Sequence, residues 1–175
     1  MPGGALGTLS LWVTSRGLRR LDFRSGPDLA HAGERLSDGS PPDHLRRAVE
    51  QLGEYLAGNR RAFDLPLDPG QVTPFQGLVY ERLRAIPHGQ VVTYGEVARD
   101  IGADAVGAAR AVGQAVGANP LAIVIPCHRV VASDRRLHGY GGGLARKAAL
   151  LRLEGLEVEG EEPASRVRPE VLRLL

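Results

Sequence analysis

A change of pattern near residue 72 is the feature that most constrains the fold. Before it, "LSLWVTSRGLRRLDF" (9–23) forms two extended runs around a turn in which Gly17 can take a positive φ. After it, short amphipathic runs follow one another, each preceded by a helix-start signal. A chain of 175 residues is long enough for one ordinary domain or two small ones. The change predicts a small α+β unit over 1–71, followed by a mainly helical unit.

The first unit is expected to contain a helix and a third strand besides the hairpin. Residues 43–59 predict a helix with a stop at Gly58, and 61–68 predict a strand that Pro66 confines to a sheet edge. A polar connection rich in Gly, Pro and Ser, 25–42, precedes the helix. The face that this helix would bury is formed by Leu45, Val49, Leu52 and Leu56.

Two capping signals open the second unit. Thr73 is a favourable N-cap and Pro74 is tolerated at the first helical position, so a helix is expected over 73–86. Thr93 and Glu96 have the spacing of a capping box, in which each side chain bonds a backbone N–H near the other residue. This pair predicts a second, shorter helix.

A further helix is expected over 105–117, after a Gly-containing turn at 102–104. Two short helices joined in this way indicate a helix-turn-helix. The outward face of the second helix is small apart from Arg110 and Gln114, whereas a solvated face normally carries several charges. Close approach to a nucleic-acid groove and packing on both sides explain this bare face equally well. The inward face would be formed by Ala105, Ala109, Val112 and Val116.

Charge is distributed unevenly along the chain. Residues 72–156 hold ten Lys and Arg against six Asp and Glu, whereas 1–71 are balanced and 157–175 are acidic. The middle segment is therefore the candidate for contact with a polyanion. No window approaches ~20 uninterrupted apolar residues, and the first residues lack the features of a signal peptide. A cytoplasmic protein without a membrane partner is expected.

Cys127 is the only cysteine and is directly followed by His128 in "IVIPCHRVV" (123–131). One cysteine excludes an internal disulfide and a multi-cysteine zinc site, and no metal is predicted. A free thiol has a pKa near ~8.5, so a histidine that accepts its proton would raise its reactivity at neutral pH. A lone cysteine after an apolar run is more often an inert buried residue, and the pair alone leaves both interpretations open.

Several motifs around this cysteine occur in the order and spacing of one family. They are "PFQ", "IPHGQVVTYGEVA", "ARAVGQAVGANP", "IPCHRVV" and "HGYGGGLARKAALLRLEG". Together they resemble the O6-alkylguanine-DNA alkyltransferases, the methylated-DNA–protein-cysteine methyltransferases. The resemblance implies an α+β protein with an N-terminal ribonuclease-H-like domain over 1–71 and a mainly helical, winged-helix-like DNA-binding and active-site domain over 72–156. Residues 157–175 extend beyond it and are expected to form a flexible tail or a short amphipathic helix.

The resemblance also implies a reaction. An alkyl group on O6 of guanine would move irreversibly to Cys127, without a cofactor, so that each molecule acts once. His128 would act as a base through a bridging water, and Glu154 would orient it. Tyr94 would help to rotate the phosphate and donate toward a guanine ring nitrogen. Asn119 matches the family's hinge asparagine.

The implied partner is double-stranded DNA containing O6-alkylguanine, bound by a monomer through the minor groove. Acceptance of O4-alkylthymine stays open. The target base must leave the stack, and Arg110 would fill the space that it vacates. Small side chains would let the helix approach the narrow groove. They are Ala108, Ala109, Ala111 and Gly113, although the helical wheel places Ala108, Ala109 and Gly113 away from the exposed face.

The guanine pocket implied by the resemblance is built largely from main chain. The carbonyl groups of Cys127 and Val130 would accept the guanine amino group, and Tyr140 would form a wall. Gly141 stands where many members have serine, so a backbone N–H of Gly141 or Gly142 must donate toward O6. The missing side chain would widen the pocket for larger alkyl groups.

Two other functions are compatible with parts of this pattern. A non-catalytic sensor of alkylated DNA, of the alkyltransferase-like type, would share the fold, but those relatives replace the acceptor cysteine that this chain keeps. A cysteine hydrolase would need an oxyanion hole and a water route for turnover, and no motif indicates them. Alkyl transfer to Cys127 is therefore the function that the sequence favours.

Overall fold

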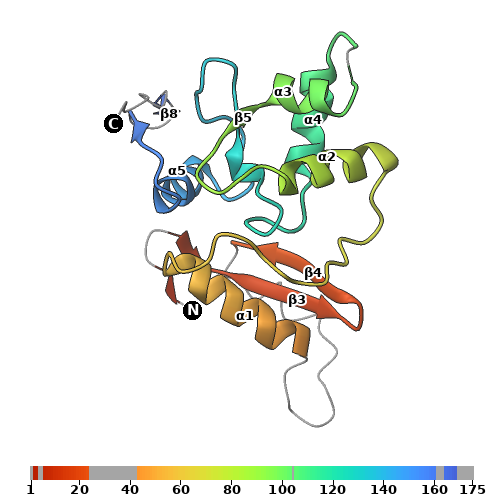
Figure 1. Ribbon diagram of the computed structural model, residues 1–175, viewed down its shortest axis with the longest axis vertical. Coiled ribbons are helices and arrows are strands. Elements are labelled where there is room, and N and C mark those ends of the chain that lie inside the picture. The colour runs from red at the N-terminus through yellow and green to blue at the C-terminus, as the bar shows by residue number, and fades with distance from the viewer. Residues whose placement is uncertain (1, 4–5, 24–42, 104, 161–163, 169–175) are drawn as a thin grey trace.

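The computed structural model describes residues 2–3, 6–23, 43–103, 105–160 and 164–168. The predicted connection over 25–42 and the last residues of the predicted tail lie outside this part of the chain. Figure 1 shows the N-terminal strands and α1 on one side of the molecule and the remaining helices on the other. This arrangement is the predicted α+β organisation with a mainly helical second half.

The predicted hairpin is present as β3 (Ser10–Thr14) and β4 (Gly17–Asp22), which pair antiparallel. Gly17 has a φ of 145°, as expected of the turn. A Cβ at Gly17 would lie 2.2 Å from the carbonyl oxygen of Pro66, so close chain packing also requires glycine here. A smaller pair, β1 (Pro2–Gly3) and β2 (Gly7–Thr8), precedes the hairpin.

Helix α1 (Asp43–Leu56) packs on the hairpin but buries a different face from the predicted one. Val49, expected inside, is 40% exposed, and the buried side is rotated toward Tyr55. The rotation arises because Tyr55 reaches from α1 into the helical half, as described below. The buried residues of the helix are Ala48, Gln51, Leu52 and Tyr55.

The strand predicted over 61–68 is wrong. Only an isolated bridge joins Leu67 to Leu18, supported by hydrogen bonds from Leu18 N to Pro66 O (2.8 Å) and from Asp68 N to Leu18 O (2.9 Å). Pro66 has no N–H to donate, so the ladder does not extend. The segment instead lies along β4 as an irregular strap.

Both predicted caps of the helical half are confirmed. Thr73 and Gln76 form a capping box at the start of α2, and Thr93 and Glu96 form another at the start of α3. These caps satisfy backbone N–H groups that a helix terminus leaves unpaired. The elements of this half are α2 (Pro74–Arg84), β5 (Val92–Thr93), α3 (Tyr94–Asp100), α4 (Ala108–Gly117), β6 (Val130–Val131) and α5 (Leu144–Leu153).

Helix α4 begins three residues later than predicted, after Gly107 with a φ of 90°. Ala105 therefore lies outside the helix, whereas Val112 and Val116 are buried as predicted. The assignment of Ala109 to the buried side is wrong, since Ala109 is exposed. Helices α3 and α4 pack against each other and against α2, which gives the expected helix-turn-helix arrangement. The buried residues of α4 are Val112, Ala115 and Val116.

The described part of the predicted tail is neither flexible coil nor helix. β7 (Val158–Glu159) and β8 (Arg166–Val167) form a small hairpin. Leu137 N donates to Ser165 O at 2.8 Å, and Val167 N donates to Arg135 O at 3.0 Å. Val167 is buried in an apolar cluster with Val131, Leu137, Ala148 and Leu151, and this packing holds the hairpin against the domain.

One hydrophobic core extends through both halves of the molecule. Leu21 of β4 forms a bridge with Leu121, and its N–H donates to Pro120 O at 2.9 Å. The segment that leads to Cys127 is thus attached to the N-terminal hairpin. Within the described residues, no helix is both long and apolar enough to span a bilayer.

Candidate active site

Cys127 begins a short 3₁₀ helix, Cys127–Arg129, that leads into β6. The segment before it contains a buried isoleucine, Ile123, with a φ of 71°, which is rare for a β-branched residue. Asn119 braces this segment, because its Nδ2 donates to Ile125 O (2.8 Å) and its Oδ1 accepts from Leu121 N (3.0 Å). The predicted hinge residue therefore holds both ends of the loop that carries Cys127.

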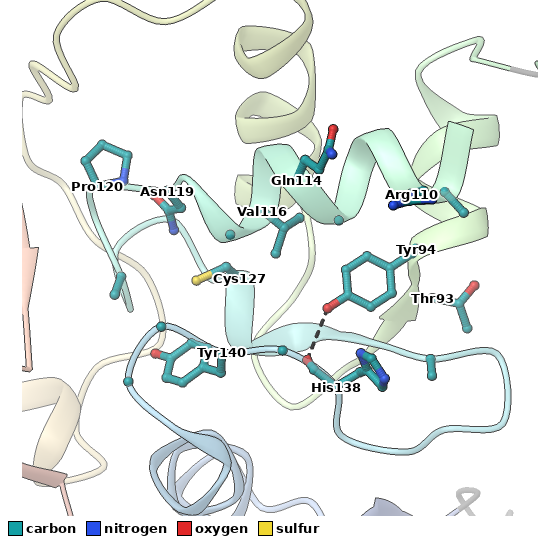
Figure 2. A pocket seen from close by; sticks show the side chains of 18 of the residues that line it. Thr93, Tyr94, Arg110, Gln114, Val116, Asn119, Pro120, Cys127, His138 and Tyr140 are labelled. Atoms are coloured by element: carbon teal, nitrogen blue, oxygen red, sulfur yellow. Dashed lines mark hydrogen bonds between the residues drawn. The ribbon is translucent and has the colours of Figure 1, made fainter. Parts of the chain in front are cut away.

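The Cys127 side chain lies on the wall of a cleft of about 1130 Å³. Figure 2 shows this side chain between α4 and the loop that carries His138 and Tyr140. Nine of the residues singled out in the sequence line the cleft: Tyr94, Ala109, Arg110, Gly113, Asn119, Cys127, Tyr140, Gly141 and Gly142. The others do not line it: Ala108 and Ala111 are half-buried on α4, and His128, Val130 and Glu154 are buried.

The N-terminal hairpin closes one end of this cleft through Arg20, Leu21, Asp22 and Phe23. The Phe23 and Tyr140 rings pack with centroids 5.7 Å apart, and the Arg146 guanidinium lies over the Phe23 ring. A Cβ at Gly142 would approach the Phe23 ring to 2.7 Å, so only glycine fits between the two aromatic rings. Sequence reasoning missed this wall because the hairpin carries no reactive group that would have marked it.

His128 and Glu154 are in contact, as the sequence analysis expected. Nε2 of His128 is 2.9 Å from Oε1 of Glu154, and both side chains are fully buried. A carboxylate only accepts, so Nε2 carries the proton and Nδ1 carries the lone pair. Nδ1 is buried and has no hydrogen-bond partner among the described residues. The imidazole is thus oriented by Glu154 with one basic nitrogen unused.

Glu154 is also held by groups that the sequence did not reveal. It caps the C-terminus of α5, where the helix dipole disfavours an anion. Arg129 compensates with charge-assisted bonds from Nη2 to Oε1 (2.8 Å) and from Nε to Oε2 (2.9 Å) and Oε1 (3.2 Å). The backbone N–H of Gly89 donates to Oε2 (3.1 Å), and the Tyr55 hydroxyl donates to Oε1 (2.7 Å). Every oxygen lone pair of this buried carboxylate therefore has a donor.

The electrostatics keep the thiol and imidazole neutral at rest. Burial raises the pKa of Cys127, and the Asn119 side chain and the Lys147 charge only partly oppose it. Burial lowers the pKa of His128, against the opposing effect of Glu154. Burial also raises the pKa of Glu154, but His128 and Arg129 outweigh this and hold it well below its ordinary value. A neutral imidazole that follows a protonated thiol in the chain supplies the base that nucleophile activation needs.

Lys147, the only lysine, is a second residue that the sequence analysis passed over. It is fully buried, and its Nζ donates to Val130 O (2.6 Å) and His138 O (2.8 Å). Burial lowers its pKa to about 8. The Val130 carbonyl, expected to accept the guanine amino group, thus already has one donor.

Tyr94 is placed at the first position of α3 by the Thr93 cap. Its ring reaches α4 near Gly113, and its hydroxyl donates to His138 O at 3.2 Å (Figure 2). The Tyr140 hydroxyl is buried and has no partner among the described residues. In the part of the chain that the structure describes, no group of three or more His, Cys, Asp and Glu side chains is positioned to hold a metal ion.

Comparisons with known proteins identify the family of both halves of the chain. Residues 5–69 match the ribonuclease-like domain of 6-O-methylguanine DNA methyltransferase, and residues 74–156 match its DNA binding domain. A methylated-DNA–protein-cysteine methyltransferase of Mycolicibacterium paratuberculosis is 55% identical over 113 residues, which are 65% of this chain and 67% of the relative. One from Methanosarcina acetivorans is 39% identical over 150 residues, covering 86% of this chain and 93% of the relative.

Solved structures show the same likeness in three dimensions. The crystal structure of Mycobacterium tuberculosis OGT in complex with DNA superposes with a TM-score of 0.70 at 42% identity. The superposition covers 86% of this chain and 88% of that one. Both halves of the fold and the motifs around Cys127 therefore lead to one conclusion: the chain belongs to the 6-O-methylguanine DNA methyltransferase family.

Proposed function

We propose that this protein repairs DNA by moving the alkyl group from O6 of guanine to Sγ of Cys127, once per molecule. Membership of the family supplies the activity, transfer from alkylated DNA to a cysteine of the protein. The position of the only cysteine supports Cys127 as the acceptor, because its thiol faces the cleft while His128 and Glu154 lie behind it. A thioether is a poor leaving group and no second thiol exists to displace it, so turnover would stop after one transfer.

The chemistry follows from the two neutral groups at rest. The Cys127 proton would pass through one water to Nδ1 of His128, whose other nitrogen donates to Glu154. The thiolate would attack the alkyl carbon, forming the C–S bond as the C–O6 bond breaks. The electron pair of that bond goes to guanine, which takes up a proton. The Tyr94 hydroxyl, now bonded to His138 O, would turn toward the base to supply it, and would recover a proton from water as His128 releases the Cys127 proton to solvent.

Binding of DNA would use the face of α4 that borders the cleft. Arg110 and Ala109 are exposed there, and Gly113 lies one turn further along. The small residues would let the helix enter the minor groove, while Arg110 replaces the extruded base. Ala108 and Ala111 are half-buried beside this face and would contribute by allowing close packing. The minor groove, a monomeric state and a cytoplasmic location are predictions from the sequence.

The cleft supports a tolerant pocket for the alkyl group. No atom lies within 4 Å of a Cβ built at Gly141, so the position that lacks the usual serine borders open space. A backbone N–H of Gly141 or Gly142 would donate toward O6, and the main chain of Cys127 and Val130 would read the amino group. Phe23 and Tyr140 would then form the apolar wall that faces a larger alkyl group.

A single-turnover titration tests the proposal. Increasing protein is added to a duplex with one O6-methylguanine, and the restored guanine is quantified by chromatography of the digested DNA. We expect conversion to rise linearly to one guanine per protein, whereas Cys127→Ser binds the duplex and converts none. Tight binding of the duplex by the wild-type chain without conversion would instead assign it to the non-catalytic sensors.

A further inference from the structure

Tyr55 brings the N-terminal half of the chain into contact with the reactive groups. It lies near the end of α1, it is fully buried, and its hydroxyl donates to Oε1 of Glu154 at 2.7 Å. Its ring packs against the rings of Phe63 and His88, with centroids 5.4 and 6.3 Å away. This packing fixes the direction of the hydroxyl toward Glu154.

The oxygen that accepts from Tyr55 is the same one that faces His128. Oε1 of Glu154 accepts hydrogen bonds from Tyr55 Oη, His128 Nε2 (2.9 Å) and Arg129 Nη2 (2.8 Å). Hydrogen bonds to one charged oxygen share its negative charge, so the loss of one donor strengthens the bonds that remain. Tyr55 therefore acts on His128 through a single shared atom.

The Tyr55 hydroxyl can donate its hydrogen bond to Glu154 over the whole working pH range. Burial, followed by the charge of Glu154, raises the pKa of Tyr55 far above its ordinary value, so the hydroxyl stays protonated. Tyr55 does not line the cleft, and its influence on the thiol must pass through the buried network. The titratable and charged groups around this network are Cys127, His128, Arg129, Tyr140, Lys147, Glu154 and, beside the Tyr55 ring, His88.

We infer that Tyr55 is a positioning residue for alkyl transfer, which fixes the Glu154 carboxylate and limits the negative charge that Glu154 presents to His128. The inference rests on the proposed function, because it gives α1 a part in the activation of Cys127. The ribonuclease-like half of the chain then contributes to the reaction itself and not only to stability.

The test is the pH dependence of single-turnover methyl transfer from an O6-methylguanine duplex to the full chain. Tyr55→Phe keeps the ring and removes the donor, so Glu154 attracts the His128 proton more strongly. The acid limb of the rate profile should move to higher pH by about half a unit, a fraction of what a hydrogen bond to a charged group can shift. Placing 3,5-difluorotyrosine at position 55 makes a stronger donor and should move the limb to lower pH.

Tyr80→Phe is the matched control. The Tyr80 hydroxyl is also buried and donates to Ala115 O at 3.2 Å, but this bond does not reach Glu154. The variant therefore reports the loss of a buried phenol hydroxyl without a change at the carboxylate. Its acid limb should stay at the wild-type pH.

Opposite shifts in the two Tyr55 variants, with Tyr80→Phe unmoved, would support the inference. Acid limbs at the wild-type pH in both Tyr55 variants would overturn it, whatever happens to the plateau rate, and would leave Tyr55 a packing residue. If Tyr55→Phe does not fold, the direction of the difluorotyrosine shift decides alone. Failure of the wild-type chain to transfer a methyl group would overturn the proposed function instead, and the same series measures it.

Discussion

At the scale of single residues, the site depends on buried polar groups that the sequence does not mark as a set. Cys127, His128 and Glu154 were predicted as a group from the resemblance, and the contact of the last two is present. Arg129 was passed over although it follows His128 directly, because its guanidinium could equally have pointed to solvent. The sequence around Lys147 is typical of an ordinary exposed helix lysine, whereas the folded chain buries this side chain completely.

Lys147 provides a prediction about stability at alkaline pH. Its pKa is about 8 in the folded chain and ordinarily 10.5, so between these values the unfolded chain binds more protons. The free energy of unfolding due to Lys147 should therefore rise with pH across this window, by at most about 3 kcal/mol. The measurement is urea unfolding at several pH values of two variants, Cys127→Ser and Cys127→Ser/Lys147→Met. Both carry Cys127→Ser, so the titration of the thiol does not contribute to the difference between them.

As the pH rises from 8 to 10, the free energy of unfolding of the variant that keeps Lys147 should increase relative to that of the double variant. The carbonyl groups of Val130 and His138 lose their common donor in the methionine variant, so it should also be less stable near pH 10. A difference that does not vary with pH would show that the folded Lys147 titrates at its ordinary value.

Gly142 provides a second prediction at this scale. A Cβ there would lie 2.7 Å from the Phe23 ring and 2.9 Å from the Tyr140 ring, so Gly142→Ala forces two packed aromatic side chains apart. We expect a loss of about 1–3 kcal/mol in the free energy of unfolding. Gly141→Ala is the control, because its Cβ meets nothing within 4 Å and should change the stability by less than about 0.5 kcal/mol. Equal losses in both variants would contradict the packing that the structure shows.

At the scale of elements, local signals predicted what local chemistry decides. The capping boxes at Thr73 and Thr93 fixed the starts of α2 and α3, since a cap is a contact within one turn. The buried face of α1 was misjudged because Tyr55 packs on residues far away in the chain. Helix α4 starts later than predicted because Gly107, with a φ of 90°, precedes it. The strand expected over 61–68 failed because Pro66 has no N–H to donate, which leaves one bridge to Leu18.

The β7–β8 hairpin gives the prediction that belongs to this scale. Val167 is 1% exposed in the cluster with Val131 and Leu151, so Val167→Ala should lower the free energy of unfolding by about 1–2 kcal/mol. Arg166→Ala, on the exposed side of the same strand, should change it by less than about 0.5 kcal/mol. Thermal and denaturant unfolding of both variants measure the difference. A neutral Val167→Ala would mean that the hairpin does not hold to the domain in solution.

At the scale of the whole molecule, the reactive groups are assembled from both halves. Tyr55 and Phe23 come from the half in which the sequence showed no reactive group, and they contact Glu154 and Tyr140. Tyr55 and Glu154 are 99 positions apart, and no periodicity or motif connects residues at that separation. The fold class and the residues that line the cleft beside Cys127 were therefore within reach of the sequence, whereas the contacts between the halves were not.

The buried network predicts how the stability of the molecule depends on acid pH. The pKa of His128 lies below its ordinary 6.5 in the folded chain, so the unfolded chain takes up a proton first as the pH falls. The pKa of Glu154 lies well below its ordinary 4.5, with the same sign. The free energy of unfolding should therefore fall below about pH 6.5 and fall further below about pH 4.5.

Guanidinium unfolding between pH 7.5 and 4 measures this profile. His128→Gln should lose the slope just below pH 6.5, while His138→Gln, whose ring is exposed, should keep it. Identical slopes in the wild-type chain and His128→Gln would show that the buried imidazole is not the group that titrates.

In the proposed reaction Cys127 accepts the alkyl group, and His128 activates the Cys127 thiol. Intact-protein mass spectrometry after incubation with an O6-methylguanine duplex, followed by peptide mapping, tests this most directly. We expect a gain of one methylene, on the Cys127 peptide alone, which saturates at one per protein and forms far more slowly in His128→Gln. An unchanged mass with bound DNA, or a methyl group on any other peptide, would contradict it.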